Sequence, residues 1–173
     1  MKTRHLLLAS LFIASLPAMA AEKIVVVNAI NDSGIGKIIG TIKLTDSAKG
    51  LVIEPDLGEL PRGTHGFHIH EKPSCDIGEK DGKKRAGLAA GGHFDPNQSS
   101  KHEGPEGHGH EGDLPALEVG GDGSATRTLL APRLKVEQLM GHSIMIHEAG
   151  DNYSDSPKPL GGGGARIACG VIE

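Results

Sequence analysis

The apolar residues of this chain fall in short runs in which they alternate with polar residues, and Gly, Pro, Asn or Asp bounds each run. A period of two places alternate side chains on opposite faces of a β-strand, so such runs predict half-buried strands. Eight stretches follow the pattern, at residues 23–30, 36–45, 50–56, 64–71, 115–120, 124–131, 142–148 and 166–172.

Eight short strands separated by turns predict an all-β fold, an eight-stranded antiparallel Greek-key barrel or sandwich. Gly121-Asp122-Gly123 is typical of a hairpin turn, and only residues 133–141 show a short helical pattern. Two polar, glycine-rich stretches interrupt the spacing, at residues 71–114 and 148–165. Structureless stretches of this length in a compact domain are usually functional or disordered. We expect two long functional loops.

Residues 1–20 have the organisation of a secretory signal peptide. Lys2 and Arg4 precede an apolar run at residues 6–16, and small residues follow at the cleavage position. The run is too short to span a membrane, so we expect cleavage after Ala20 and a domain of residues 21–173 without a membrane anchor. An uncleaved amino-terminal anchor is the alternative.

Cleavage would remove Lys2 and Arg4 and no acidic residue, which takes the formal charge from −4 to −6. A net negative charge argues against nucleic acid as a partner. The remaining chain, about 150 residues, is enough for a single core and one domain. No later stretch is long and apolar enough to cross a membrane.

Cys75 and Cys169 are the two cysteines of the chain. In an exported protein an even number of cysteines predicts disulfide bonding, here a single bridge. Two separate buried thiols are the alternative, which export makes the poorer one.

Histidines alternate with core residues in the sequence HGFHIH. Phe67 and Ile69 share the face expected to point into the core, so His68 and His70 share the opposite face. At that separation two imidazoles can chelate one metal ion.

Other potential ligands occur in the second histidine-bearing strand, which ends with His147, and in the first long loop. The loop supplies His93, His102, His108, His110 and Asp113. Imidazole suits copper and zinc, and a carboxylate can complete a tetrahedral zinc site. Any one of these residues could simply be solvated, but together, around one pair of strands, they favour a metal site.

Six segments carry a resemblance to a known family: GFHIH, GGHFDP, KHEGPEG, HEGDLP, MIHEAGDN and GGGGARIACGVI. They resemble copper/zinc superoxide dismutase, specifically its bacterial exported branch, in the family's order from about residue 24 to 172. The resemblance implies one copper and one zinc ion per subunit, superoxide as substrate and a periplasmic location. It implies dismutation of superoxide to dioxygen and hydrogen peroxide, which protects the cell envelope. Bacterial members occur as monomers and dimers, and we favour a homodimer.

The resemblance assigns ligands by position. The copper ligands fall on His68, His70, His93 and His147. The zinc ligands fall on His93, His102, His110 and Asp113. One imidazolate bridges both metals in the family, and two flanking dications favour the loss of its proton. The family pattern His-x-Gly-Asp selects His110 over His108, while His65 and His142 match no ligand position and are expected to be surface residues or partners of the ligands.

Two further roles come from the resemblance alone. Asp151 corresponds to the family's aspartate that accepts hydrogen bonds from His68 and His102; a turn-forming aspartate is the alternative. Arg166 corresponds to the arginine that holds the anionic substrate beside copper, with the disulfide keeping the preceding loop near it. In the family mechanism His93 leaves reduced copper, takes up a proton and later returns it.

Loop cations could add weaker guidance of the substrate, although neighbouring carboxylates offset most of their charge. They are Lys72, Lys80, Lys83, Lys84 and Arg85. The rival function is an exported protein that stores or delivers copper or zinc without turnover. Such a protein is expected to lack a copper ligand or the arginine. Every matched position is filled here, which favours the enzyme.

Overall fold

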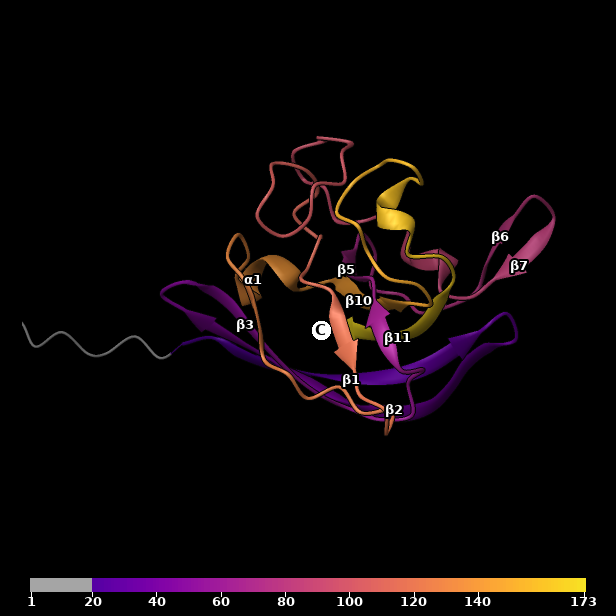
Figure 1. Ribbon diagram of the computed structural model, residues 1–173, viewed down its shortest axis with the longest axis horizontal. Helices are drawn as coiled ribbons and strands as arrows, with labels where there is room; N and C mark the ends of the chain where they lie inside the picture. Colours follow the sequence, from indigo (N-terminus) through magenta and orange to yellow (C-terminus); the bar gives the residue numbers. More distant parts are fainter. Residues whose placement is uncertain (1–19) are drawn as a thin grey trace, which may run out of the picture.

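The computed structural model describes residues 20–173 and is built on a curled antiparallel sheet (Figure 1). Seven strands follow one another in the order β5-β10-β11-β1-β2-β3-β9. Their bounds are β1 (Glu22–Asn31), β2 (Gly34–Ser47), β3 (Gly50–Leu57), β5 (Phe67–His70), β9 (Leu129–Ala131), β10 (His142–His147) and β11 (Arg166–Ile172). Apart from Ala20, the predicted signal peptide lies outside the described residues. Within those residues, no helix has the length and apolarity to cross a membrane.

A second pair of strands closes the curl. β4 (Gly63–His65) pairs with β8 (Leu117–Val119), and beyond Gly66 the same chain segment becomes β5 and pairs with β10. On the other side, Ala125 forms a bridge to Leu57 at the end of β3. With β4 and β5 taken as one run, each predicted run contains a strand, and the eight-stranded antiparallel barrel is confirmed.

Alternation within the strands fills the barrel with aliphatic side chains. Ile42 and Leu44 of β2 are fully buried, as are Phe67 and Ile69 of β5. Burial of one such side chain contributes about 1.5–3 kcal/mol. Because Phe67 and Ile69 occupy the interior, His68 and His70, which alternate with them, take the outer face of the sheet, as predicted.

One predicted loop contains an additional hairpin. Residues 71–114 include β6 (Gly78–Lys80) and β7 (Lys83–Arg85), which project from the body in Figure 1. Asp81 and Gly82 at its tip have φ angles of 53° and 68°. The Asp-Gly pair is a strong hairpin signal, but its flanks are charged and lack apolar alternation, so the prediction of a structureless stretch was wrong here.

Two other elements are shorter than predicted. The run at 124–131 forms a strand only at β9, and residues 126–128 are exposed. The remaining contact with the sheet is the isolated bridge between Ala125 and Leu57. The helical pattern at 133–141 yields a single turn, α1 (Val136–Leu139), which Gly141 follows with a φ of 80°. Two 3-10 turns, η1 (Leu88–Ala90) and η2 (Leu160–Gly162), lie in the long loops.

The disulfide expected from the cysteine count joins Cys75 in the first long loop to Cys169 in β11, with Cα atoms 5.7 Å apart. The cysteines are 94 residues apart in sequence. In the chain-entropy model a crosslink over such a distance stabilises the fold by about 4–5 kcal/mol. It also fastens the start of the long loop to the strand that begins with Arg166.

Candidate metal centre

Two neighbouring strands place three histidines on one side of the sheet. His68 and His70 lie on β5 opposite Met145 and Ser143 of β10, and His147 ends β10 beyond a shift in register. All three side chains are buried, because the two long loops cover this side of the barrel (Figure 1). The face that carries the histidines therefore lies outside the apolar core and still away from bulk water.

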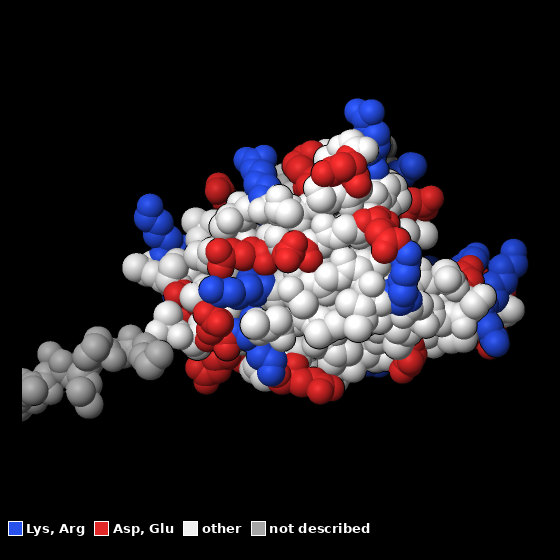
Figure 2. Space-filling view, turned by 90° about the horizontal axis from the view of Figure 1, so that it is seen from below, with Lys and Arg blue, Asp and Glu red and all other residues white. Residues whose placement is uncertain are grey.

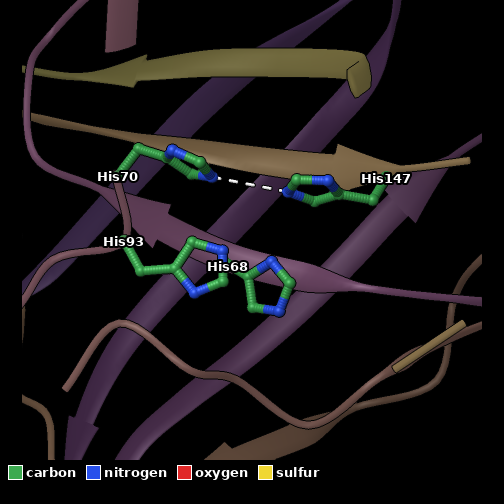
Figure 3. Close-up of side chains that lie close together, drawn as sticks. All are labelled: His68, His70, His93 and His147. Carbon is green, nitrogen blue, oxygen red and sulfur yellow. Dashed lines mark hydrogen bonds between the residues drawn. The ribbon is translucent and has the colours of Figure 1, made fainter. Parts of the chain in front are cut away.

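The first long loop adds a fourth histidine to this group. A backbone bridge between His70 and His93 holds His93 beside β5. The ligand atoms of His68, His70, His93 and His147 all lie within 4.8 Å of one another. Figure 3 shows the rings of His70 and His147 pointing toward each other, with His93 and His68 side by side next to them.

Hydrogen bonds fix which ring nitrogens of the two facing histidines carry protons. His70 Nδ1 lies 3.0 Å from the carbonyl oxygen of Gly91, and His147 Nδ1 lies 3.4 Å from that of Gly164. A carbonyl can only accept, so both Nδ1 atoms must donate. In the neutral rings the Nε2 atoms then carry lone pairs, and these atoms face each other at 3.4 Å (Figure 3).

His68 directs a third lone pair into the same group. Its Nε2 lies 2.7 Å from Asp151 Oδ2, and because a carboxylate accepts, this nitrogen carries the proton. Its Nδ1 is buried and has no hydrogen-bond partner among the described residues. Lone pairs converging in a buried space are unfavourable unless a cation lies between them, and neutral imidazole is a copper and zinc ligand. The residues present fit a metal ion.

A second group surrounds the carboxylate of Asp113, whose side chain is fully buried. Its Oδ1 lies 2.9 Å from His93 Nδ1 and 3.4 Å from His110 Nδ1, and its Oδ2 lies 3.0 Å from His102 Nδ1. The predicted zinc ligands are thus brought together. The four residues whose ligand atoms lie within 4.8 Å of one another here are His68, His93, His102 and Asp113. His110 is not among them, although its Nδ1 is buried without a hydrogen-bond partner in the described chain.

Asp151 links the two groups. Its Oδ2 accepts from His68 Nε2 and its Oδ1 accepts from His102 Nε2, both at 2.7 Å, with the carboxylate fully buried. Gly161 makes room for this contact: a Cβ there would lie 1.9 Å from Asp151 Oδ1, and its φ is 69°. The bridging position expected for Asp151 is the one it occupies, and it orients one ring in each group.

The first group is held neutral by burial. Desolvation lowers the pKa of His70 and of His147 well below the usual range. Burial, together with the nearby His68 ring, lowers the pKa of His93 to about 4. Metal ligands must be deprotonated, so these rings are in the coordinating form.

The second group is built around an ionised carboxylate. Burial alone would raise the pKa of Asp113, but the nearby rings of His102, His110 and His93 outweigh it and hold the pKa far below the usual range. Burial opposes charge on His102 as well, yet its bonds to Asp113 and Asp151 raise its pKa to about 9. Once His102 gives up its proton, its imidazole and those of His93 and His110, with the ionised carboxylate, make a donor set suited to zinc.

Arg166 lies at the edge of the first group. Its Nη1 donates to the carbonyl of Gly87 at 2.5 Å and its Nη2 to that of Gly91 at 2.6 Å. The Gly91 oxygen also accepts from His70 Nδ1, so one carbonyl joins the arginine to the histidine group. Burial lowers the pKa of Arg166, and the carboxylate of Glu71 acts in the opposite direction; an arginine keeps its charge in such a setting.

A cleft of about 360 Å³ opens onto these residues. Its wall includes His93, His147, Lys158, Leu160 and Arg166 and, within residues 20–173, no acidic side chain. Lys158 and Leu160 were not identified from the sequence. The sequence feature that could have identified them is their position in the predicted functional loop 148–165, directly before the glycines that precede Arg166.

The histidines without a ligand position differ in their settings. His65 was expected to be a surface residue or a partner of the ligands; it is only 2% exposed, with its ring nitrogens 2.7 Å from the carbonyls of Pro61 and His147. The surface alternative is thus wrong. His142 is half-buried against Phe94, and His108 is exposed, as expected.

Comparisons with known proteins agree on one family. A family model described as copper/zinc superoxide dismutase (SODC) matches residues 38–172. A superoxide dismutase [Cu-Zn] of Escherichia coli K12 is 52% identical over 174 residues, which cover 100% of both chains. The structure of a Cu/Zn superoxide dismutase from Brucella abortus superposes with a TM-score of 0.87 at 49% identity, covering 88% of this chain and 100% of that one. The monomeric copper, zinc superoxide dismutase from Salmonella enterica gives 0.80 at 52% identity, with the same coverage of 88% and 100%.

Proposed function

The chain belongs to the copper/zinc superoxide dismutase family, and we propose that its buried histidines form one copper site and one zinc site that share His93. It is an oxidoreductase that converts superoxide to dioxygen and hydrogen peroxide with one copper and one zinc ion per chain. The copper ligands are His68, His70, His93 and His147. The zinc ligands are His93, His102, His110 and Asp113.

The convergence of lone pairs carries the copper assignment. The Nε2 atoms of His70 and His147 face each other at 3.4 Å, and the free Nδ1 of His68 belongs to the same group. For zinc, His110 is preferred over His68 because the two nitrogens of His68 are already used, one by Asp151 and one by the copper group. His110 brings its free Nδ1 to Asp113 and completes three imidazoles and a carboxylate.

When bound, copper supplies one-electron chemistry, accepting an electron from one superoxide and passing it to the next, while zinc contributes charge without redox change. Arg166 binds and orients the anion with the N–H groups that its two carbonyl contacts leave free. His93 has its Nδ1 directed at Asp113, which leaves Nε2 as the atom able to hold and release a proton in the cleft. Burial of the ligand rings restricts water to the side of the cleft.

Metal content and turnover test this proposal together. We expect the purified protein to carry one copper and one zinc per chain by elemental analysis and to be active in a xanthine oxidase/cytochrome c assay. Chelation should abolish activity, and the two metals together should restore it. Full occupancy by iron or manganese, or one metal per chain, would contradict the sites. Two bound metals without turnover would favour metal storage or delivery.

We further propose that residues 1–20 are a signal peptide and that residues 21–173 form the domain that acts in the periplasm, protecting the cell envelope. The Cys75–Cys169 disulfide supports this, since such bonds persist in oxidising compartments. Amino-terminal sequencing of the protein from a periplasmic fraction should begin at Ala21. A sequence beginning at Met1, or recovery with the cytoplasm, would contradict export.

A homodimer is proposed on the outer face of β1 and β2. Ile24, Val26, Ile35 and Ile38 are 48–61% exposed there. Seen from that side, areas without charged residues lie between the charged side chains (white in Figure 2). Grouped exposed apolar side chains mark association sites. Sedimentation equilibrium should give twice the chain mass, and Ile38→Lys should give the single mass. A parent protein at the single-chain mass at about 100 μM, as in the relative named monomeric, would refute the dimer.

A further inference from the structure

The segment that supplies two of the proposed zinc ligands has almost no regular structure. Residues 99–114 contain neither helix nor strand, apart from an isolated bridge between Asp113 and His68. Within the segment, the His110 N–H donates to the Lys101 carbonyl at 2.8 Å. The other two backbone bonds inside the segment, from Gly107 to Gly104 and from Asp113 to His110, are longer, at 3.3 and 3.5 Å. A side-chain contact from outside the segment can therefore add to its order.

Arg133 makes that contact from outside the segment. Its guanidinium donates to four backbone carbonyls of the zinc loop, defined here as residues 101–113. They are those of Pro105 at 3.0 Å, Gly109 and Gly104 at 3.2 Å, and His110 at 2.6 Å. Ala131 and Leu134 on either side of Arg133 are buried in the core, which fixes its backbone to the barrel.

The charge of Arg133 is balanced by these carbonyls. In residues 20–173 the one arginine ion pair joins Arg85 to Asp32, so no carboxylate pairs with Arg133. A planar guanidinium offers five N–H donors in a fixed fork, and hydrogen bonds from a charged donor are about twice as strong as neutral ones. Without it, four carbonyl dipoles would point at one another across a turn of chain. The guanidinium thus gives the loop a permanent cation on its inner side.

We propose that Arg133 is a positioning residue for zinc: it holds the zinc loop in its metal-binding conformation independently of the metal. The inference rests on the proposed zinc site. Its shortest contact is to the carbonyl of His110, the ligand whose ring lies furthest from Asp113 among the three. A loop already ordered loses less conformational freedom when it binds, so Arg133 raises the affinity for zinc.

The effect should be confined to one metal. His68, His70 and His147 stand on β5 and β10, and none of the four carbonyls that Arg133 holds belongs to them. Loss of the guanidinium should therefore weaken zinc and leave copper nearly unchanged. A residue that merely stabilised the whole barrel would weaken both metals in parallel.

The test uses the holoenzyme and its Arg133→Met and Arg133→Lys variants. Each is equilibrated with graded concentrations of a chelator of known affinity, and the zinc and copper retained are measured separately. We expect the zinc dissociation constant of Arg133→Met to rise about 10–100-fold, the range typical of groups that orient metal ligands, with copper changed less than about threefold. Arg133→Lys should lie between, because an ammonium keeps the charge without the fork.

Two controls make each outcome decisive. Arg127→Met removes an exposed arginine from the connection between β8 and β9 and should leave both metals unchanged, while Asp113→Ala removes a proposed ligand and should lose zinc. Zinc retention equal to the parent, or an equal loss of both metals, in Arg133→Met overturns the role of Arg133. If Arg133→Met does not fold, Arg133→Lys decides by the same criterion. A parent that holds no zinc contradicts the zinc site itself, which is a separate result.

Discussion

Replacing His93 with alanine should remove zinc binding and superoxide turnover together. His68 and His93 occur in both groups of ligand atoms, and of the two only His93 is assigned to both metals; its ring stacks on His68 at 4.0 Å between centroids. Changes to groups that merely orient ligands cost about 10–100-fold in affinity or activity, so loss of a ligand shared by two metals should cost at least about 100-fold in rate. Zinc and copper content and the dismutation rate are measured on the same samples.

The fold should survive this change. The contact that places His93 beside β5 is a backbone bridge to His70, which alanine preserves. His108→Ala is the matched control, since His108 is an exposed histidine of the same loop and belongs to neither group. It should keep both metals and full activity. Loss of one metal from His93→Ala with complete retention of the other would contradict the bridging role.

The strands and the side of the sheet that carries the ligands were predictable because they follow from local alternation. Phe67 and Ile69 must enter the core, and period-two geometry then places His68 and His70 on the other face whatever the rest of the chain does. The resemblance supplied the loop ligands, which no periodicity marks. The role of Asp151 also came from the resemblance alone: its sequence context is that of an ordinary turn, yet its carboxylate accepts hydrogen bonds from two histidines.

The features that were not predicted depend on contacts between residues far apart in sequence. Arg133 meets carbonyls 23 to 29 positions away, and in the sequence it is one arginine before a short helix. His65 is buried with its ring against the carbonyl of His147, 82 positions away. Burial of the ligand histidines depends on how two loops fold over the sheet. Such pairings are set by the packed chain as a whole rather than by any local pattern.

The net charge of the protein should repel its substrate, because the cleaved chain would carry a formal charge of −6 and superoxide is an anion. Local potential can reverse the effect of net charge when a cleft with low-dielectric walls concentrates the field, and this family is among the proteins for which such focusing was described. The cleft here is lined by Arg166 and Lys158 without an opposing acid among the described residues. The loop cations, considered from sequence as a weaker source of guidance than Arg166, do not line this cleft. Lys80 and Arg85 line a neighbouring pocket that also contains Arg166, together with the acidic Asp32.

Arg166→Glu should therefore keep both metals and lose most of its activity. Guidance by local charge typically raises association rates by about 10–1000-fold and weakens as salt screens it over roughly 8–10 Å. Reversing the charge at the end of the cleft should bring a loss in that range and a salt dependence that flattens or inverts. Arg166→Lys should fall between, because lysine retains the charge but cannot hold the Gly87 and Gly91 carbonyls with a planar fork.

Because Arg166 also supports the carbonyl that His70 uses, a loss of rate could come from a disturbed copper ligand. Lys158→Glu separates the two causes, because it reverses a charge in the same cleft. Among the described residues, the Lys158 side chain makes no hydrogen bond to a ligand histidine or to the carbonyls that hold His70 and His147. It should lower the rate at low salt, more weakly than Arg166→Glu, and reduce the salt dependence in the same direction. Lys49→Glu, in the turn between β2 and β3 and outside the cleft, makes the same change in net charge and should have little effect. If Arg166→Glu, with both metals in place, matched the parent at low ionic strength, substrate attraction would have to come from elsewhere on the surface.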